Sequence, residues 1–136
     1  MNVLNSSFNK FIKLKIYYED TDAGGVVYYA NYLKFLERAR SEAIYSLGLS
    51  NKELLDKEGI IIIVKSCNIE YKKPAKFEDE IQIISKINEV KNSSFKMHQI
   101  IKKDITIISE ADVLLVTVNK EGKPVRIPNL LKKLIS

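Results

Sequence analysis

One long helical pattern, from Tyr29 to Leu47, is the feature that most constrains this chain, because the segments around it follow strand patterns. Within it, apolar residues recur every three or four positions, at Tyr32, Leu33, Leu36, Ala39, Ala43, Ile44 and Leu47. Charged side chains take the other side, as in an amphipathic helix. Gly48 supplies a C-terminal stop. About 19 residues at about 1.5 Å each give a rod of about 28 Å, long enough to cross a small domain.

The segments before and after this helix are typical of strands. Ile12, Leu14 and Ile16 alternate with polar residues, which predicts a first strand with one buried face. Four later segments are rich in β-branched residues and are separated by turn signals: Ile60 to Lys72, Glu80 to Lys91, Ser94 to Lys102 and Ile105 to Val118. Their short connections favour antiparallel neighbours. The order predicts an α+β fold with a five-stranded antiparallel sheet packed on the helix, and not a doubly wound parallel sheet.

Shorter signals complete this outline. Ser50 and Glu53 have the spacing of a capping box, which predicts a short helix over 51–57 that ends before Gly59. The tail over 128–135 is expected to form one or two helical turns. The run from Ile60 to Val64 is apolar on both faces, so we expect the long helix to cover one side and a partner subunit to cover part of the other.

Length and composition limit the class of protein. The 136 residues fit one domain, 1–136, without a second core. Cys67 is the only cysteine, which excludes an intrachain disulfide and favours a reducing compartment, so we expect a cytoplasmic protein. Met1 to Phe11 lacks the apolar core of a secretory signal. No apolar run approaches the roughly 20 residues of a membrane span.

A net charge of +5 is compatible with an anionic partner but does not identify one. The basic residues are spread along the chain, without an Arg-rich block or the aromatic array of an RNA-binding module. We therefore expect no nucleic-acid partner.

The candidate active site is the segment that precedes the long helix. It places Asp22 and the pair Gly24 and Gly25 just before the first helical turn. Unsatisfied N–H groups and a partial positive charge of roughly +0.5 at a helix N-terminus stabilise a carbonyl oxygen that becomes negative. Glycines allow the backbone to approach a ligand closely. Val27 and Tyr28, between the glycines and the helix, are expected to contact the substrate as well.

Other interpretations of this segment remain open or fail. Asp20 and Asp22 may serve only as turn residues that accept backbone hydrogen bonds. A calcium loop fails further along, because Asn31 stands where a bidentate Glu is required. The G-x-G-x-x-G of a dinucleotide-binding turn is absent.

Cysteine and histidine offer no second catalytic scheme. Cys67 lies within an apolar segment and is expected to be a small core residue. His98 falls on the polar side of its strand, so we expect an exposed histidine. One cysteine and one histidine far apart predict neither a metal site nor a Cys-His pair. We expect no cofactor.

The segment from Tyr17 to Arg40, YYEDTDAGGVVYYANYLKFLERAR, resembles the signature of the 4-hydroxybenzoyl-CoA thioesterase family of hotdog proteins. Its likeness is strongest to the acyl-CoA thioesterase branch associated with the Tol-Pal system. The similarity extends through 70–75, 110–111 and 124–128, and so covers nearly the whole chain. One departure is Tyr29, since many members of the Tol-Pal branch have His there while the 4-hydroxybenzoyl branch has Tyr. The branch, and with it the preferred acyl group, stays open.

The resemblance implies a hotdog fold, in which an antiparallel sheet wraps a long central helix. It also implies homodimers with joined sheets and shared active sites, often paired into homotetramers. It assigns the catalytic carboxylate to Asp22, and it assigns the backbone N–H that polarises a thioester carbonyl to Tyr29. The expected reaction is hydrolysis of acyl-CoA to the free acid and coenzyme A, with Asp22 either attacking the carbonyl or activating water.

Two further expectations concern binding. Lys73 lies near Pro74 at a predicted strand end, and Arg126 lies after the last strand, so either side chain can meet the phosphates of coenzyme A; both also fit ordinary exposed residues. The alternative function is a non-catalytic module that binds acyl-CoA or an acyl carrier protein on the same fold.

Overall fold

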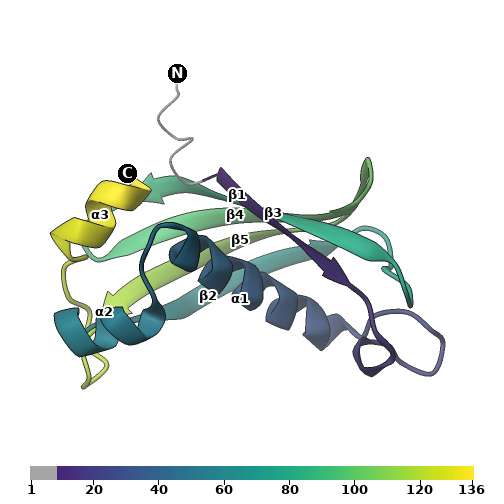
Figure 1. Ribbon diagram of the computed structural model, residues 1–136, viewed down its shortest axis with the longest axis horizontal. Coiled ribbons are helices and arrows are strands. Elements are labelled where there is room, and N and C mark those ends of the chain that lie inside the picture. Colours follow the sequence, from purple (N-terminus) through teal and green to yellow (C-terminus); the bar gives the residue numbers. More distant parts are fainter. Residues whose placement is uncertain (1–8) are drawn as a thin grey trace.

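The computed structural model describes residues 9–136, drawn in colour in Figure 1. Its elements are β1 (Asn9–Lys15), α1 (Tyr29–Ser46), α2 (Asn51–Glu58), β2 (Ile61–Tyr71), β3 (Glu80–Val90), β4 (Ser94–Lys103), β5 (Thr106–Val118) and α3 (Asn129–Ile135). A single 3₁₀ turn, Tyr18–Asp20, lies between β1 and α1. Most of the segment considered for a secretory signal, Met1 to Phe11, lies outside the described residues.

The strands form one five-stranded sheet in the order β1-β3-β4-β5-β2, in which every neighbouring pair is antiparallel. Short turns join β3 to β4 and β4 to β5, as the sequence predicted. Alternate residues of β4 face the helix and are buried, among them Phe95, Met97 and Ile101. The predicted α+β architecture is confirmed.

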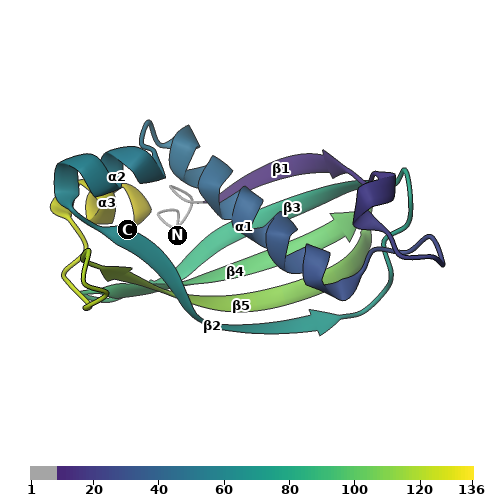
Figure 2. The same ribbon diagram turned by 90° about the horizontal axis from the view of Figure 1, so that it is seen from below.

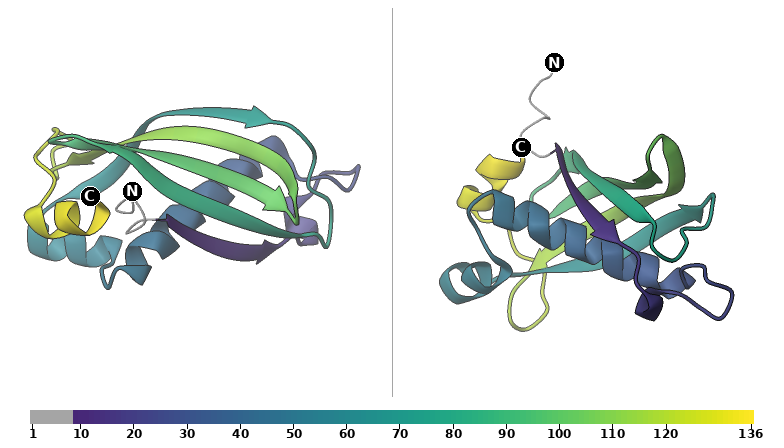
Figure 3. Two further views of the ribbon diagram at one scale, coloured as in Figure 1. Left: turned by 90° about the horizontal axis from the view of Figure 1, so that it is seen from above. Right: turned by 45° about the vertical axis from the view of Figure 1, so that its right-hand side comes forward.

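Helix α1 lies across the concave face of the sheet, which curves around it (Figures 2 and 3). Its closest packing is against β1 and β3. The buried side chains are Tyr32, Phe35, Leu36, Ala39, Ala43 and Ile44. Leu33, which the spacing assigned to the buried face, is instead 47% exposed, and Phe35 contributes to the core. The cause is that Leu33 lies on the side of α1 turned away from β1 and β3.

Strand β2 occupies one edge of the sheet, so only β5 pairs with it. Burial on both faces of Ile60 to Val64 is therefore wrong for a single chain: Ile60 is buried, but the exposed fractions of Ile61, Ile63 and Val64 are 40–45%. Cys67 was expected in the core and is exposed on the same edge strand. Cover by a partner subunit stays a prediction.

A buried polar network ties α1 to the sheet. Gln99 on β4 donates from Nε2 to the Leu36 carbonyl at 3.1 Å and to Ser85 Oγ at 2.9 Å, and its Oε1 accepts from Arg40 Nη1 at 2.9 Å. Buried polar groups are stable only when they are paired in this way. The network fixes the rotation of α1, and with it the direction in which Arg40 points.

The two short helices lie together beyond the C-terminal end of α1 (Figure 2). Helix α3 follows Pro128 and buries Leu131 and Ile135, which confirms the helical turns predicted for the tail. Within residues 9–136, no helix is long and apolar enough to cross a membrane.

Candidate active site

The loop between β1 and α1 is built from two tight turns. In the first, Asp20 Oδ2 accepts the backbone N–H of Tyr17 at 2.9 Å, so this carboxylate is used to shape the 3₁₀ turn. In the second, the N–H of Asp22 donates to the Val26 carbonyl at 2.9 Å, and the N–H of Gly25 donates to the Asp22 carbonyl at 3.0 Å. Gly25 has a φ of 80°, a conformation that glycine adopts at little cost.

Asp22 projects from the start of the second turn with one carboxylate oxygen committed. Its Oδ1 accepts the backbone N–H of Gly24 at 2.8 Å. Within residues 9–136, no hydrogen bond to Oδ2 is found. A Cβ at Gly24 would lie 3.3 Å from Asp22 Oδ1, so glycine leaves room for the carboxylate. The turn interpretation thus accounts for Asp20 and for one of the two Asp22 oxygens.

Backbone bonds fasten the loop to its surroundings. The Asp20 carbonyl accepts both the N–H of Tyr28 at 3.2 Å and Nδ2 of Asn31 at 2.9 Å, which joins the 3₁₀ turn to the beginning of α1. The N–H of Val27 donates to the Ala75 carbonyl at 2.9 Å, which joins the loop to the segment after β2. Asp22 is therefore held in a fixed position relative to the helix.

Helix α1 begins without a cap. Its N-cap residue is Tyr28, which makes no side-chain capping hydrogen bond, and its first turn contains no acidic residue. Backbone N–H groups in a first helical turn have no intrahelical partner. In the described part of the chain no acceptor is found for the N–H of Tyr29, the first helical residue. This leaves a donor with partial positive charge beside the Asp22 turn.

A cleft of about 450 Å³ opens at this helix start. It is lined by Asp22, Val26, Val27, Tyr28, Tyr29, Tyr32, Tyr71, Lys72, Lys73 and Pro74. The ring centroids of Tyr29 and Tyr71 lie 4.8 Å apart, and Tyr71 Oη is 3.5 Å from the Tyr29 carbonyl oxygen. Both the volume and the mixed aromatic and polar lining are typical of a small-molecule site.

The wall of the cleft is made rigid by Tyr32. Its buried hydroxyl accepts the backbone N–H of Ala75 at 3.0 Å, and its ring contacts Tyr71 edge-on. Burial raises the pKa of the Tyr32 phenol, and partial burial raises that of Tyr71. Both phenols are therefore neutral at physiological pH, and Asp22 is the carboxylate that lines this cleft.

Residues 17–135 match the family model of the thioesterase-like superfamily. The chain belongs to this superfamily. An acyl-CoA thioesterase named YbgC, from Haemophilus influenzae, is 37% identical over 120 residues, which cover 88% of each chain. The crystal structure of a probable thioesterase from Bartonella henselae has 33% identity and a TM-score of 0.85, covering 88% of this chain and 99% of that one. These relatives confirm the family predicted from the signature segment.

The hotdog fold of this thioesterase-like chain is confirmed by a more distant structure. The 4-hydroxybenzoyl-CoA thioesterase from Pseudomonas sp. strain CBS-3 superimposes with a TM-score of 0.86, at 23% identity. The match covers 93% of this chain and 98% of that one. At this identity the likeness concerns the fold alone.

Most of the predicted site residues of this thioesterase-like chain meet at one cleft. Asp22, Val27, Tyr28, Tyr29 and Lys73 all line it, although Val27 is almost fully buried and contributes to its floor. The two glycines, Gly24 and Gly25, shape the Asp22 turn and are not among the lining residues. Close approach of a ligand to them stays a prediction.

Arg126 lies at the other end of the sheet in the same chain. Its neighbour Ile127 donates from its backbone N–H to the carbonyl of Asn92, in the turn after β3, whereas the cleft lies before β3 begins. The eleven residues of β3 span about 36 Å at about 3.3 Å each. Arg126 and Asp22 of one chain therefore cannot hold one thioester group, and a phosphate role for Arg126 stays a prediction.

Tyr71, Lys72 and Pro74 were not assigned to the site from the sequence, although the family likeness extended over 70–75. Their spacing gives no signal, because only the sheet edge brings them to the start of α1. Lys72 is tied to Glu110 at 3.3 Å. Within the described residues, no ion pair to Lys73 and no cluster of metal-binding side chains is found.

Proposed function

We propose that this chain hydrolyses acyl-CoA thioesters, with the Asp22 carboxylate acting on a carbonyl that the N-terminus of α1 polarises. The observation that carries the proposal is the meeting of two unsatisfied groups at one cleft. Asp22 Oδ2 is an acceptor without a partner in the described residues, and the first turn of α1 has donors without a cap. A thioester placed between them meets a base or nucleophile and an oxyanion donor together.

The chemistry of a thioester suits this small set of groups. A thiolate is a good leaving group, so no strong general acid is needed once the carbonyl is attacked. If Asp22 attacks, the C–S bond breaks to leave an acyl-aspartyl anhydride that water then hydrolyses. If Asp22 activates water, the proton passes to the carboxylate as the C–O bond forms. One oxyanion donor of the Tyr29 type is worth about 10² to 10³ in rate.

Family membership supports the same substrate class. The Haemophilus influenzae relative is named an acyl-CoA thioesterase, and a relative from Helicobacter pylori with the same name is 30% identical and covers 92% of this chain. At the cleft, Lys73 is suited to meet a phosphate of coenzyme A, because its ammonium is not tied to a carboxylate of the described residues. Lys72, paired with Glu110, is less suited.

We further propose that the working form is a homo-oligomer. The support is strand β2, an eleven-residue edge strand with several exposed apolar side chains. An unpaired edge of this length is normally covered in native proteins. Sedimentation at micromolar concentration tests the proposal, and a monomer contradicts it.

The test of the proposed reaction is release of free thiol from a panel of acyl-CoA and acyl carrier protein thioesters. Asp22→Asn is the test variant, because the amide keeps the shape and the acceptor for Gly24 while it removes the charge. Asp20→Asn is the matched control, since the amide oxygen still accepts from Tyr17 in the neighbouring turn. We expect turnover by the wild type and by Asp20→Asn, and loss of at least about 10² for Asp22→Asn.

The competing class of function predicts a different result. A module that only binds acyl-CoA or an acyl carrier protein would release no thiol in any of the proteins. Substrate binding without thiol release by the wild type would replace the proposed function with that alternative. Equal turnover by Asp22→Asn and the wild type would keep the activity and remove Asp22 from the mechanism.

A further inference from the structure

A second cavity, of about 130 Å³, lies beside the C-terminal half of α1 and apart from the Asp22 cleft. Its apolar lining includes Ile44 of α1 together with Phe95, Met97 and Leu115 of the sheet. Arg40 also lines it. The family signature does not account for this combination of an apolar lining and a fixed guanidinium.

Arg40 is held in this cavity by a single neutral partner. Its Nη1 donates to Gln99 Oε1, and Gln99 is itself fixed by Ser85 and the Leu36 carbonyl. Burial lowers the pKa of the guanidinium, which nevertheless stays charged. Among residues 9–136, no carboxylate lies within ion-pair distance of Arg40. An arginine has five N–H donors, so most of those on Arg40 remain for another group.

Within one chain, the cavity and the Asp22 cleft lie at opposite ends of the edge strand β2. Tyr71 lines the cleft, whereas Ile62 and Val64 line the cavity. Along α1, the eleven residues from Tyr29 to Arg40 correspond to about 17 Å at about 1.5 Å each. A thioester held at Tyr29 is therefore far from Arg40 of the same chain.

Strand β2 is suited to a second copy of this chain. Its outer edge has unpaired N–H and C=O groups, and Ile61, Ile63 and Val64 are partly exposed along it. Lys65 and Glu70 lie on either side of the strand's middle. Antiparallel pairing with an identical strand, about an axis between Cys67 and Asn68, places each of these charges opposite its complement. The strand is thus complementary to itself in charge as well as in backbone hydrogen bonding.

We propose that a second copy pairs antiparallel with β2, and that the cavity beside Arg40 of one subunit completes the Asp22 cleft of the other and receives the acyl group. Antiparallel pairing brings the Tyr71 end of each β2 beside the Val64 end of its partner, so each cleft meets the partner's cavity. The inference rests on the proposed function, because it assigns the acyl half of the same site. Leu33, exposed on α1 between the two hollows, becomes part of the wall they share.

The size and lining of the cavity define the substrate class. A cavity of about 130 Å³ is close in size to an engineered cavity of about 150 Å³ that binds benzene. It therefore accepts a short aliphatic acyl group or a single aromatic ring. Arg40 is a positioning residue that donates hydrogen bonds to the acyl end of the bound substrate. Long-chain acyl-CoA is expected to be hydrolysed more slowly than a short or one-ring acyl-CoA.

The test is complementation between inactive subunits. Asp22→Asn and Arg40→Met chains with different affinity tags are co-expressed, and the hybrid dimer is purified through both tags and assayed with a short acyl-CoA. Each parental homodimer is expected to lose at least about tenfold. In the hybrid, one site combines the intact Asp22 of one subunit with the intact Arg40 of the other, so it regains about half of the wild-type activity per dimer.

Hybrid activity no higher than the mean of the two parental dimers overturns the inference. If Asp22→Asn homodimers are as active as the wild type, the proposed role of Asp22 fails, and the inference fails with it. If they are inactive and the hybrid is inactive too, only the inference is wrong.

A second pair of variants guards against loss of folding in Arg40→Met. Ser41→Phe on the rim of the cavity narrows it without removing the Gln99 bond, and it must also complement Asp22→Asn. Arg38→Met, on the exposed side of α1, is the control and should retain wild-type turnover. A Ser41→Phe homodimer that hydrolyses the whole acyl-CoA panel at wild-type rates contradicts the inference.

Discussion

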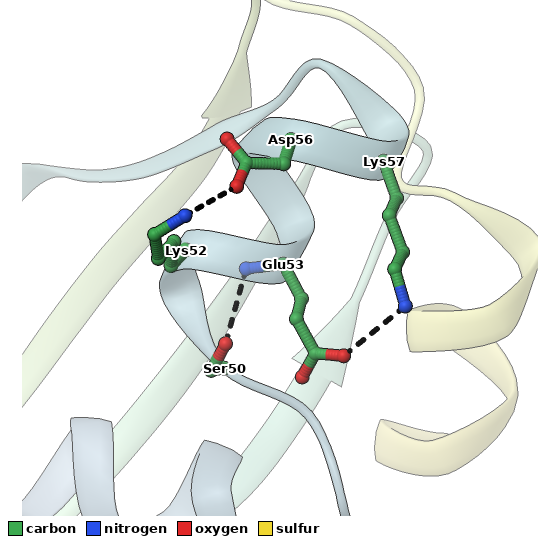
Figure 4. Close-up of polar contacts among 5 residues, drawn as sticks. All are labelled: Ser50, Lys52, Glu53, Asp56 and Lys57. Carbon is green, nitrogen blue, oxygen red and sulfur yellow. Dashed lines mark hydrogen bonds and ion pairs between the residues drawn. The ribbon is translucent and has the colours of Figure 1, made fainter.

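The N-termini of α1 and α2 meet the same physical requirement in opposite ways. At α2, Ser50 Oγ accepts the N–H of Glu53 at 3.0 Å, and the ion pairs Lys52–Asp56 and Lys57–Glu53 follow along the helix (Figure 4). Gly59 in the left-handed conformation ends it. At α1, the N-cap is Tyr28, without a side-chain bond and without an acidic residue in the first turn.

The difference shows how a sequence separates a structural helix end from a functional one. The donors of α2 are satisfied by its own side chains, so this end needs no ligand. The donors of α1 are exposed at a cleft that also contains Asp22, and the chain around them is fixed by Val27 and Asn31. The capping cost left at α1 is offset when a developing oxyanion takes the place of the cap.

Adding a cap to α1 should abolish much of the difference and much of the activity. In Tyr28→Asp, the new carboxylate accepts from the first-turn N–H groups and places negative charge where the oxyanion would form. We expect kcat/KM to fall by about 10², with stability unchanged or higher by up to about 1 kcal/mol. The control is Tyr28→Ala, which removes the ring without adding an acceptor. Equal kinetics for the two variants would show that the exposed donors are not used.

Removing the hydroxyl of Tyr32 tests the rigid wall of the cleft. In Tyr32→Phe, the N–H of Ala75 loses its acceptor inside the core. An unsatisfied buried donor costs about 1–3 kcal/mol, and chemical denaturation should show a loss of that size. The Val27 bond to Ala75 shares this segment, so kcat should fall modestly as well. Unchanged stability would mean that water reaches the Ala75 N–H.

The α2 cap should affect stability alone. Ser50→Ala removes the acceptor for Glu53 and is expected to cost about 1 kcal/mol, measured by urea unfolding. Ser50→Thr keeps a hydroxyl and should cost less. Because α2 lines no part of the Asp22 cleft, thiol release by both variants should match the wild type. A loss of turnover in Ser50→Ala at full folding would connect the two helices in an unexpected way.

The smallest expected effect concerns His98 on the outer face of the sheet. Asp112 Oδ1 lies 2.9 Å from its Nδ1 and Glu110 Oε1 lies 3.3 Å from its Nε2, while Lys72 pairs with Glu110 and Lys86 is its cross-strand neighbour. The hydrogen bond to Asp112, and then that to Glu110, raises the pKa of His98 above its ordinary value.

A raised folded-state pKa sets the sign of the pH dependence. The stabilisation by His98 is fully present below its unfolded pKa of about 6.5 and is lost as pH rises through the higher folded value. His98→Asn should therefore lower the melting temperature more near about pH 6 than near about pH 8.5. Thermal melts at the two pH values measure the difference. An equal or opposite difference would contradict the assigned contacts.

The sequence predicted the elements well because most of them carry local signals. The period of α1, the Ser50 cap and the short turns between β3, β4 and β5 are all visible in the chain. The capping box at α2 formed only in part, since the Glu53 carboxylate pairs with Lys57. Asp22 and Tyr29 were assigned through the family likeness, and the fold brings them to one cleft.

The wrong predictions share one cause, which is the position of β2 at the edge of the sheet. Cys67 and the run from Ile61 to Val64 have the composition of a core strand, but burial depends on which strand stands at the edge. Leu33 has the correct helical spacing and still lies exposed, because α1 packs on β1 and β3. Such choices depend on long-range pairing, for which a single sequence contains no periodic signal.

The central claim is that Asp22 performs chemistry at a thioester that the rest of the cleft binds. The most direct measurement compares binding and single-turnover hydrolysis of one acyl-CoA by the same Asp22→Asn preparation. The account predicts a Kd within a few-fold of the wild-type KM, and a first-turnover rate lower by at least about 10². A first-turnover rate equal to that of the wild type would contradict it.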